Sequence, residues 1–160
     1  MIEKTLVLIK PDGVQRGIVG EIIHRFEKVG LKIIAMKMFH VDKEFAKIHY
    51  EAHVDKKFYP GLEALITMGP VVAMVLEGID AIELVRKMVG STEPKSAAPG
   101  TIRGDYAHVS YGYADGQGIS IKNVIHASGD KADAEKEVKL WFTDDEVFDY
   151  ESVHDNHIRR

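Results

Sequence analysis

The residues whose types and spacing could carry out chemistry lie at positions 123–130, in the segment NVIHASGD. Its apolar residues predict the end of a buried β-strand, and Gly129 and Asp130 then break the strand and open a helix. Because side chains alternate along a strand, His126 and Ser128 should lie on the same side of it. The sequence therefore predicts a histidine and a serine together at a strand-to-helix junction.

His126 has properties that suit a covalent nucleophile. Imidazole is among the side chains that form covalent intermediates, and its reference pKa of about 6.5 leaves much of it unprotonated near neutral pH. The free N–H groups and positive dipole end of the following helix favour a nearby anion such as phosphate. A lone histidine more often simply ends a strand, so the rest of the chain must decide between the two interpretations.

Lys10 is predicted to lie at the end of a central strand. The nearly continuous apolar run over residues 5–9 is typical of such a strand. Pro11 cannot continue the hydrogen-bond ladder, and Asp12 and Gly13 favour a turn. Taken alone, a lysine at this position would be a solvated flank of the strand.

Two arginines and a threonine follow later in the chain. Arg86 falls on the flank of a helix predicted over residues 80–89. Thr92 lies near the start of a loop over residues 91–100, rich in proline, serine and alanine, and Arg103 lies just beyond its end. A single arginine is usually solvated. An anionic ligand would nevertheless need such local positive charge, because the formal net charge of the chain is −4.

Two histidines and an aromatic residue raise other possibilities. His49 and His53 are spaced i, i+4 on a helix predicted over residues 43–53, which could place two metal ligands on one face. Their order is not that of a metalloprotease and no third ligand is obvious, so no metal held by the protein is predicted. Phe58, before a short helix predicted over residues 63–68, could stack on a base or pack locally, and both interpretations stay open.

Composition limits the class of protein. A chain of 160 residues forms one compact domain, and 45% hydrophobic with 29% charged residues is ordinary for a globular protein. The absence of cysteine excludes a disulfide scaffold and thiol catalysis, and it fits a reducing cytoplasm, where we expect the protein. The negative charge argues against dedicated nucleic-acid binding, and no stretch is long enough to span a membrane.

The order of predicted elements indicates the fold class. Four strands with helices on one face predict an α+β fold, a ferredoxin-like βαββαβ sandwich with an antiparallel four-stranded sheet. A small doubly wound sheet is the alternative. No Gly-x-Gly-x-x-Gly or P-loop motif follows a strand, so a nucleotide would be held without them. The other predicted elements are helices over 20–30, strands over 31–41 and 69–76, a hairpin or excursion over 108–120, and a polar tail over 143–160.

The chain resembles the nucleoside diphosphate kinase family in a series of motifs that follow the family's order. They span residues 1–142, and so many motifs in one order are a highly specific signal. The motifs are KPDGVQRG (10–17), HY (49–50), FYPGL (58–62), GPVVAM (69–74), RKMVG (86–90), PGTIRGD (99–105) and NVIHAS (123–128).

The resemblance implies transfer of the terminal phosphate from a nucleoside triphosphate to a nucleoside diphosphate, in a ping-pong mechanism through a phosphohistidine, with Mg²⁺ bound with the nucleotide. His126 would be the nucleophile, Glu137 would hold its far ring nitrogen, and Ser128 would support Glu137 or the site. The other implied residues are Lys10, Tyr50, Arg86, Thr92 and Arg103 around the phosphates, Asn123 and Lys10 at the ribose 3′-hydroxyl, and Phe58 and Leu62 at the base. Cationic side chains suit phosphoryl transfer, and stacking tolerates any base.

Three departures from the family pattern matter. Ala127 and Gly129 replace the commoner glycine and aspartate around Ser128, while His126 and Ser128 remain. Residues 107–122 form a longer segment than in many members, and either Ile119 or Ile121 in it would cover the base. Ala52 stands where the family often has an acidic residue near the metal. Any Mg²⁺ would therefore be contacted through water and phosphate.

We expect a single domain over residues 1–142 and a tail over 143–160 packed on that domain or on a neighbouring subunit. The tail resembles that of longer-tailed members, which implies a homo-oligomer, a hexamer built from dimers, with trimer contacts from the loop over 91–100. Two other functions stay open. One is a catalytically inert ferredoxin-like protein for nucleotide binding or assembly, and the other is a metal-dependent hydrolase using His49 and His53.

Overall fold

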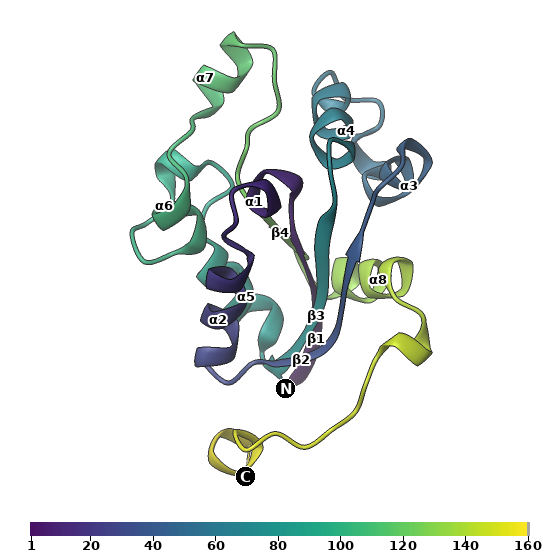
Figure 1. The fold of residues 1–160 in the computed structure, drawn as a ribbon, viewed down its shortest axis with the longest axis vertical. Helices are drawn as coiled ribbons and strands as arrows, with labels where there is room; N and C mark the ends of the chain where they lie inside the picture. Colours follow the sequence, from purple (N-terminus) through teal and green to yellow (C-terminus); the bar gives the residue numbers. More distant parts are fainter. Residues whose placement is uncertain (160) are drawn as a thin grey trace.

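The computed structural model describes residues 1–159, and Arg160 lies outside the described residues. Its centre is a four-stranded antiparallel sheet with the strand order β2-β3-β1-β4 (Figure 1). The strands are β1 (Ile2–Ile9), β2 (Lys32–Phe39), β3 (Val71–Ile79) and β4 (Ile125–Ala127). This order, with helices in the connections, confirms the predicted ferredoxin-like α+β fold.

Helices cover both faces of this sheet. The main helices are α2 (Val19–Lys28), α3 (Lys43–His49), α4 (Tyr59–Thr67), α5 (Ala81–Val89) and α8 (Lys131–Trp141). Shorter elements are α1 (Pro11–Gln15), η1 (Glu51–His53), η2 (Pro94–Ser96), α6 (Ile102–Tyr106), α7 (Tyr111–Gly116), η3 (Asp144–Glu146) and η4 (Asp155–Arg159).

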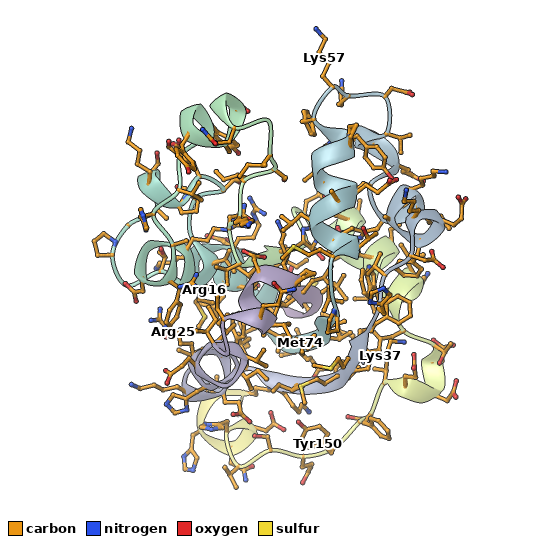
Figure 2. The ribbon with its side chains drawn as sticks, turned by 45° about the horizontal axis from the view of Figure 1, so that its top comes forward. Arg16, Arg25, Lys37, Lys57, Met74 and Tyr150 are labelled. Atoms are coloured by element: carbon orange, nitrogen blue, oxygen red, sulfur yellow. The ribbon has the colours of Figure 1, made fainter. Side chains whose placement is uncertain are left out.

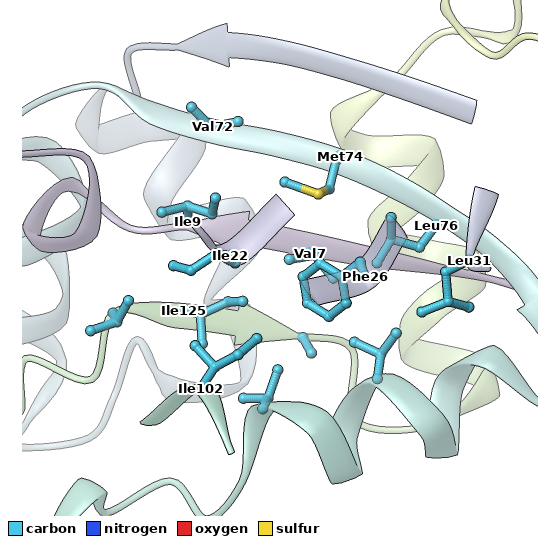
Figure 3. Close-up of a cluster of buried hydrophobic side chains, with 14 of the residues drawn as sticks. Val7, Ile9, Ile22, Phe26, Leu31, Val72, Met74, Leu76, Ile102 and Ile125 are labelled. Carbon is cyan, nitrogen blue, oxygen red and sulfur yellow. The ribbon is translucent and has the colours of Figure 1, made fainter. Parts of the chain in front are cut away.

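Strand β1 explains why both faces must be covered. Val7 and Ile9 point into a core formed with α2 and α5 (Figure 3), while Leu6 and Leu8 point into a second core formed with α3, α4 and α8. All four side chains are fully buried. The prediction of helices on one face only is therefore corrected: a continuous apolar run in a central strand indicates burial on both sides.

Two segments predicted as turns form short helices. Pro11 occupies the first turn of α1, where its missing N–H costs no hydrogen bond, and Lys10 before it is extended. Within the segment predicted as a hairpin, the Ser110 hydroxyl accepts a hydrogen bond from the Tyr113 N–H and starts α7. The run Tyr-Ala-Asp-Gly looks like a hairpin turn, but a serine cap three residues earlier favours a helix.

The tail, which is drawn in yellow in Figure 1, lies along the outer edge of β2. Phe148 N donates to Ile34 O (2.7 Å), and the Tyr150 hydroxyl donates to Ile33 O (2.7 Å). Its last helix, η4, is joined to β3 by an ion pair between Arg159 and Glu77 (2.9 Å). The division of the chain at residue 142 stays a prediction. No helix within residues 1–159 has the length and apolar character needed to cross a membrane.

Candidate active site

A cavity of about 590 Å³ opens where β1 ends and β4 begins. It lies between two projecting parts of the molecule, α3 with α4 and α6 with α7 (Figures 1 and 2). Most residues predicted for the site line this cavity, namely Lys10, Tyr50, Phe58, Leu62, Arg86, Thr92, Arg103, Asn123 and His126. The other two lie behind His126: Glu137 is hydrogen-bonded to His126, and Ser128 is hydrogen-bonded to Glu137.

His126 is held from behind by a carboxylate. It lies in β4 opposite Leu8 of β1, and its Nε2 is 2.7 Å from Glu137 Oε2 on α8. Ser128 Oγ donates to the same oxygen (3.2 Å) and accepts from the Leu6 N–H (3.2 Å). A carboxylate can only accept hydrogen bonds, so Nε2 carries the proton and Nδ1 keeps its lone pair. The geometry leaves Nδ1 as the nitrogen available for chemistry.

His49 lies beside His126 and is kept uncharged. The two ring centroids are 5.0 Å apart in an edge-to-face arrangement, and the Trp141 indole N–H donates to His49 Nδ1 (3.2 Å). Burial, with smaller effects from His126 and Lys10, lowers the pKa of His49 well below its usual value. The ring of His53 instead lies 5.5 Å from that of Phe58. Within residues 1–159 no group of three metal-binding side chains occurs, and His49 is engaged by Trp141 rather than paired with His53.

Lys10 is a buried cation that faces the cavity. Its Nζ donates to Asn123 Oδ1 (2.6 Å), and Asn123 Nδ2 donates to Thr92 O (2.9 Å). Burial, and then the charge of Arg103, lowers the pKa of Lys10 to about 8. An anion in the cavity would reverse this effect, because it would favour the charged form of the amine.

Arg103 joins three stretches of backbone around the cavity. Its guanidinium donates to Asn123 O (3.2 Å), Gly90 O (3.1 Å) and Ile125 O (2.6 Å). Burial, and then the charge of Arg86, lowers the pKa of Arg103 to about 10. The arginine thus holds β4 in place and also concentrates positive charge in the cavity.

A strained turn at Val124 delivers Asn123 and His126 to the cavity. Val124 has φ +72°, and the Ile125 N–H donates to Asn123 O (2.8 Å), which defines the rare and strained form of the γ-turn. Asp12 Oδ2 accepts from the Val124 N–H (2.9 Å), and the Lys10 N–H donates to Val124 O (2.8 Å). This role of Asp12 was not predicted from the sequence, because no sequence signal marks a valine for positive φ.

Tyr50 and Phe58 differ in their surroundings. Tyr50 is buried, and burial, with a smaller effect from Glu137, raises the pKa of its hydroxyl, which stays protonated. Phe58 is 56% exposed at the mouth of the cavity. Lys57, next to it, extends away from the molecule at the tip of the same projection (Figure 2). An exposed aromatic ring at a cavity mouth is suited to stacking on a flat ligand.

Other lining residues were not singled out from the sequence, or were left undecided. Ile119 and Ile121 both line the cavity, so the segment over 107–122 contributes to its wall. Tyr111 and Asp115 of α7 line it too. They were missed because α7 was predicted as a hairpin.

The donor groups of the cavity do not form a protein-held metal site. Among the described lining residues Asp115 and Asp133 carry carboxylates and the others are cationic or neutral, while Glu51 is ion-paired with Lys136. Mg²⁺ prefers oxygen ligands and usually keeps several waters while it binds substrate phosphates. These residues fit a divalent ion that enters with the phosphates of a nucleotide.

Comparisons with known proteins agree with this arrangement. The family model described as nucleoside diphosphate kinase matches residues 3–147. The nucleoside diphosphate kinase of Pyrococcus abyssi is 56% identical over 154 residues, covering 96% of this chain and 92% of that protein.

Solved structures are similar over nearly the whole chain. The nucleoside diphosphate kinase of Borrelia burgdorferi, a transition-state mimic with bound vanadate and ADP, matches with a TM-score of 0.95 at 45% identity, covering 99% of this chain and 97% of that one. The enzyme of Halobacterium salinarum in complex with CDP matches with a TM-score of 0.88 at 44% identity, covering 98% of each chain.

The fold and its relatives define a phosphotransferase that acts on nucleotides. The chain belongs to the nucleoside diphosphate kinase family. Its activity is transfer of the terminal phosphate of a nucleoside triphosphate to a nucleoside diphosphate, and the relatives favour this activity over an inert nucleotide-binding protein.

The lowered pKa of Lys10 predicts how activity depends on pH. In the free enzyme the amine loses its proton above pH 8, so kcat/KM for the triphosphate should fall by about tenfold per pH unit there, because kcat/KM reports ionisation of the free enzyme. A Lys10→Arg variant keeps its charge and should lack this decline, whatever its absolute rate. The check is a pH–rate profile from pH 6 to 9.5 for both proteins. The same decline in Lys10→Arg would exclude Lys10 as its source.

Asp12 should matter for stability through the Val124 turn. Asp12→Ala removes the acceptor of a buried N–H and should lower the free energy of unfolding by about 2 kcal/mol. Asp12→Asn keeps an acceptor oxygen and should cost less than half as much. Urea unfolding of the three proteins measures both values, and equal losses in the two variants would contradict this role.

Proposed function

We propose that His126 is the phosphate acceptor in a two-step exchange and that the cavity holds the nucleotide for both steps. The observation that carries the proposal is the hydrogen bond from His126 Nε2 to Glu137, which leaves the Nδ1 lone pair free in a cationic cavity. Phosphoryl transfer needs an aligned nucleophile and compensated charge, and it needs little other covalent help.

In the first step Nδ1 attacks the terminal phosphorus of the triphosphate. The new N–P bond forms as the bond from that phosphorus to the bridging oxygen breaks, and the nucleoside diphosphate leaves. The ring becomes positively charged, and the Glu137 carboxylate, whose bond to Nε2–H is retained, stabilises it. In the second step a terminal oxygen of another diphosphate attacks the phosphohistidine, and the nitrogen regains its lone pair.

The cations around the cavity have distinct tasks in this proposal. Lys10, Arg86 and Arg103 compensate charge on the moving phosphoryl group and on the leaving diphosphate, and arginine's planar fork suits phosphate oxygens. Tyr50 and Thr92 contribute hydroxyl groups to the phosphates. These groups are fixed before the substrate arrives, so little reorganisation is needed during transfer.

The remaining lining residues orient the nucleoside. Asn123 and Lys10, already hydrogen-bonded to each other, would bind the ribose 3′-hydroxyl. Phe58 would stack on the base with Leu62 beside it. Stacking is tolerant of base identity because every base has a π-face, so the site accepts several nucleotides.

The nucleotide in this proposal carries Mg²⁺. Mg²⁺ bound with the nucleotide would supply positive charge that compensates the charge developing on the phosphates during transfer, beside Lys10, Arg86 and Arg103. We also propose a homo-oligomer, a hexamer, with the loop over 91–100 in trimer contacts, and a cytoplasmic location in keeping with the cysteine-free sequence.

A phosphoenzyme experiment tests the nucleophile. Incubation with ATP labelled at the γ-phosphate should yield one acid-labile, base-stable phosphate per chain, and His126→Asn should abolish both labelling and phosphate exchange. His49→Asn is the matched control at the neighbouring ring and should still be labelled. Undiminished labelling of His126→Asn would exclude this assignment.

Glu137 can be tested through the negative charge that it places beside the ring. In Glu137→Gln the amide oxygen can take the place of Oε2 and keep both hydrogen bonds, but the side chain is uncharged and no longer stabilises the positive ring of the phosphorylated histidine. We expect kcat to fall by about 100-fold, the size typical of losing one group that stabilises charge in the transition state. Glu135→Gln, an exposed change on the same helix, should leave kcat unchanged. Similar values for the two variants would contradict the role of Glu137.

A further inference from the structure

The wall contributed by α7 contains residues that the proposed mechanism does not use. Tyr111, Ala114 and Asp115 of this helix line the cavity. Tyr111 and Asp115 are four residues apart and therefore lie on the same face of the helix. Ala114 is 1% exposed and anchors the helix to the rest of the protein.

The cavity has opposite electrical character at its two ends. At the end next to His126, the three cations Lys10, Arg86 and Arg103 outweigh the one acidic lining residue near Gly129, Asp133, so this end is positive. The other end is lined from α4, α7 and the segment after α7 by Phe58, Leu62, Tyr111, Ala114, Asp115, Ile119, Ser120 and Ile121. Among these described lining residues Asp115 is the charged one. A ligand with negative phosphates at one end and N–H donors at the other would match both ends.

Helix α7 is attached to the loop over residues 91–100 at its N-terminal end and is closed by a local hydrogen bond at its C-terminal end, so the backbone position of Asp115 is defined before a ligand binds. The Tyr111 N–H donates to Glu93 Oε1 (2.9 Å), and the Lys95 N–H donates to Val109 O (3.2 Å). At the other end, the Ile119 N–H donates to Ala114 O (3.0 Å). A group that is already in place loses little conformational entropy when it binds a ligand.

The Asp115 carboxylate has no hydrogen-bond or ion-pair partner within residues 1–159. A carboxylate has two acceptor oxygens and no donor. It therefore pairs best with two N–H groups that lie side by side, in the manner of an arginine–carboxylate pair.

We propose that the Asp115 carboxylate accepts hydrogen bonds from the base of the nucleotide and makes guanine the preferred base. Guanine carries N1–H and the exocyclic N2–H₂ on adjacent atoms, so it can donate two parallel hydrogen bonds to one carboxylate. The inference rests on the proposed function to the extent that Phe58 and Leu62 mark the base end of the cavity.

The other bases do not offer this pair of donors. In adenine and cytosine an amino group lies beside a ring nitrogen that is an acceptor, and its lone pair repels the second carboxylate oxygen. In uracil and thymine one N–H lies between two carbonyl oxygens. Stacking would still hold these bases. Asp115 would therefore make kcat/KM differ between the nucleotides without excluding any of them.

The test compares GDP, ADP and IDP as phosphate acceptors for the wild type, Asp115→Asn and Asp55→Asn. IDP has guanine's N1–H but lacks the 2-amino group. Asp55 is an exposed acid before Phe58 that does not line the cavity, so Asp55→Asn controls for loss of one negative charge near the same opening. The measured quantity is kcat/KM for each acceptor.

For the wild type we expect kcat/KM for GDP to exceed that for ADP by about tenfold, with IDP between them, the size expected for one exposed pair of charge-assisted hydrogen bonds. In Asp115→Asn the GDP value should fall by about tenfold. The kcat/KM for ADP should rise by a few-fold, because the asparagine oxygen can accept from adenine's amino group while its NH₂ donates to the adjacent ring nitrogen. Asp55→Asn should keep the wild-type ratio.

Three results would overturn the inference: equal use of GDP and ADP by the wild type, equal factors for both acceptors in Asp115→Asn, or IDP equal to GDP. Each of these requires that phosphate exchange occurs. Absence of exchange with every nucleotide would instead refute the proposed function itself, so the two failures are distinguishable.

Discussion

The hydrogen bond between Glu137 and His126 Nε2 is the interaction on which the rest of the site depends. It joins the last strand to the last main helix, and through Ser128 it is linked to the backbone of the central strand β1. A free imidazole could expose either nitrogen. Here the carboxylate accepts a hydrogen bond from Nε2–H, and Nδ1 faces a cavity lined by cations. Because Glu137 lies on α8, the packing of this helix on the sheet determines which nitrogen of the ring carries the proton.

The cations themselves are held at a cost in free energy. Lys10 and Arg103 are largely buried, and their lowered pKa values show that the protein without ligand disfavours their charged forms. The main cause is burial, followed by the charges of neighbouring arginines, and a phosphate group entering the cavity would offset both effects. The strained turn at Val124 belongs to the same pattern, because it is held by Asp12 and places Asn123 next to Lys10. Strain and crowded charge thus lie where a substrate is expected to bind.

Much of this could be predicted from the sequence because local signals agreed with one another. The apolar run before Lys10, the strand-to-helix junction at His126 and the motifs spread over the chain predicted the fold and nine of the residues that line the cavity. Glu137 followed only from the family resemblance, since nothing in its own helix distinguishes it from Glu135.

Other features depended on contacts that no local pattern records. A hairpin was expected where the cap by Ser110 starts helix α7, and this helix places Asp115 in the cavity wall. The positive φ of Val124 arises from a hydrogen bond to Asp12, more than a hundred residues earlier in the chain. Helices on the second face of the sheet were missed because a one-sided layer was assumed, although the apolar run in β1 already indicated burial on both sides.

The central claim is that Glu137 leaves Nδ1 as the reactive nitrogen of His126. The most direct test is NMR of the phosphoenzyme, with ¹⁵N-labelled histidine and phosphorus coupling to identify the nitrogen that carries the phosphate. The account predicts phosphate on Nδ1 and a proton on Nε2. Phosphate on Nε2 would contradict it.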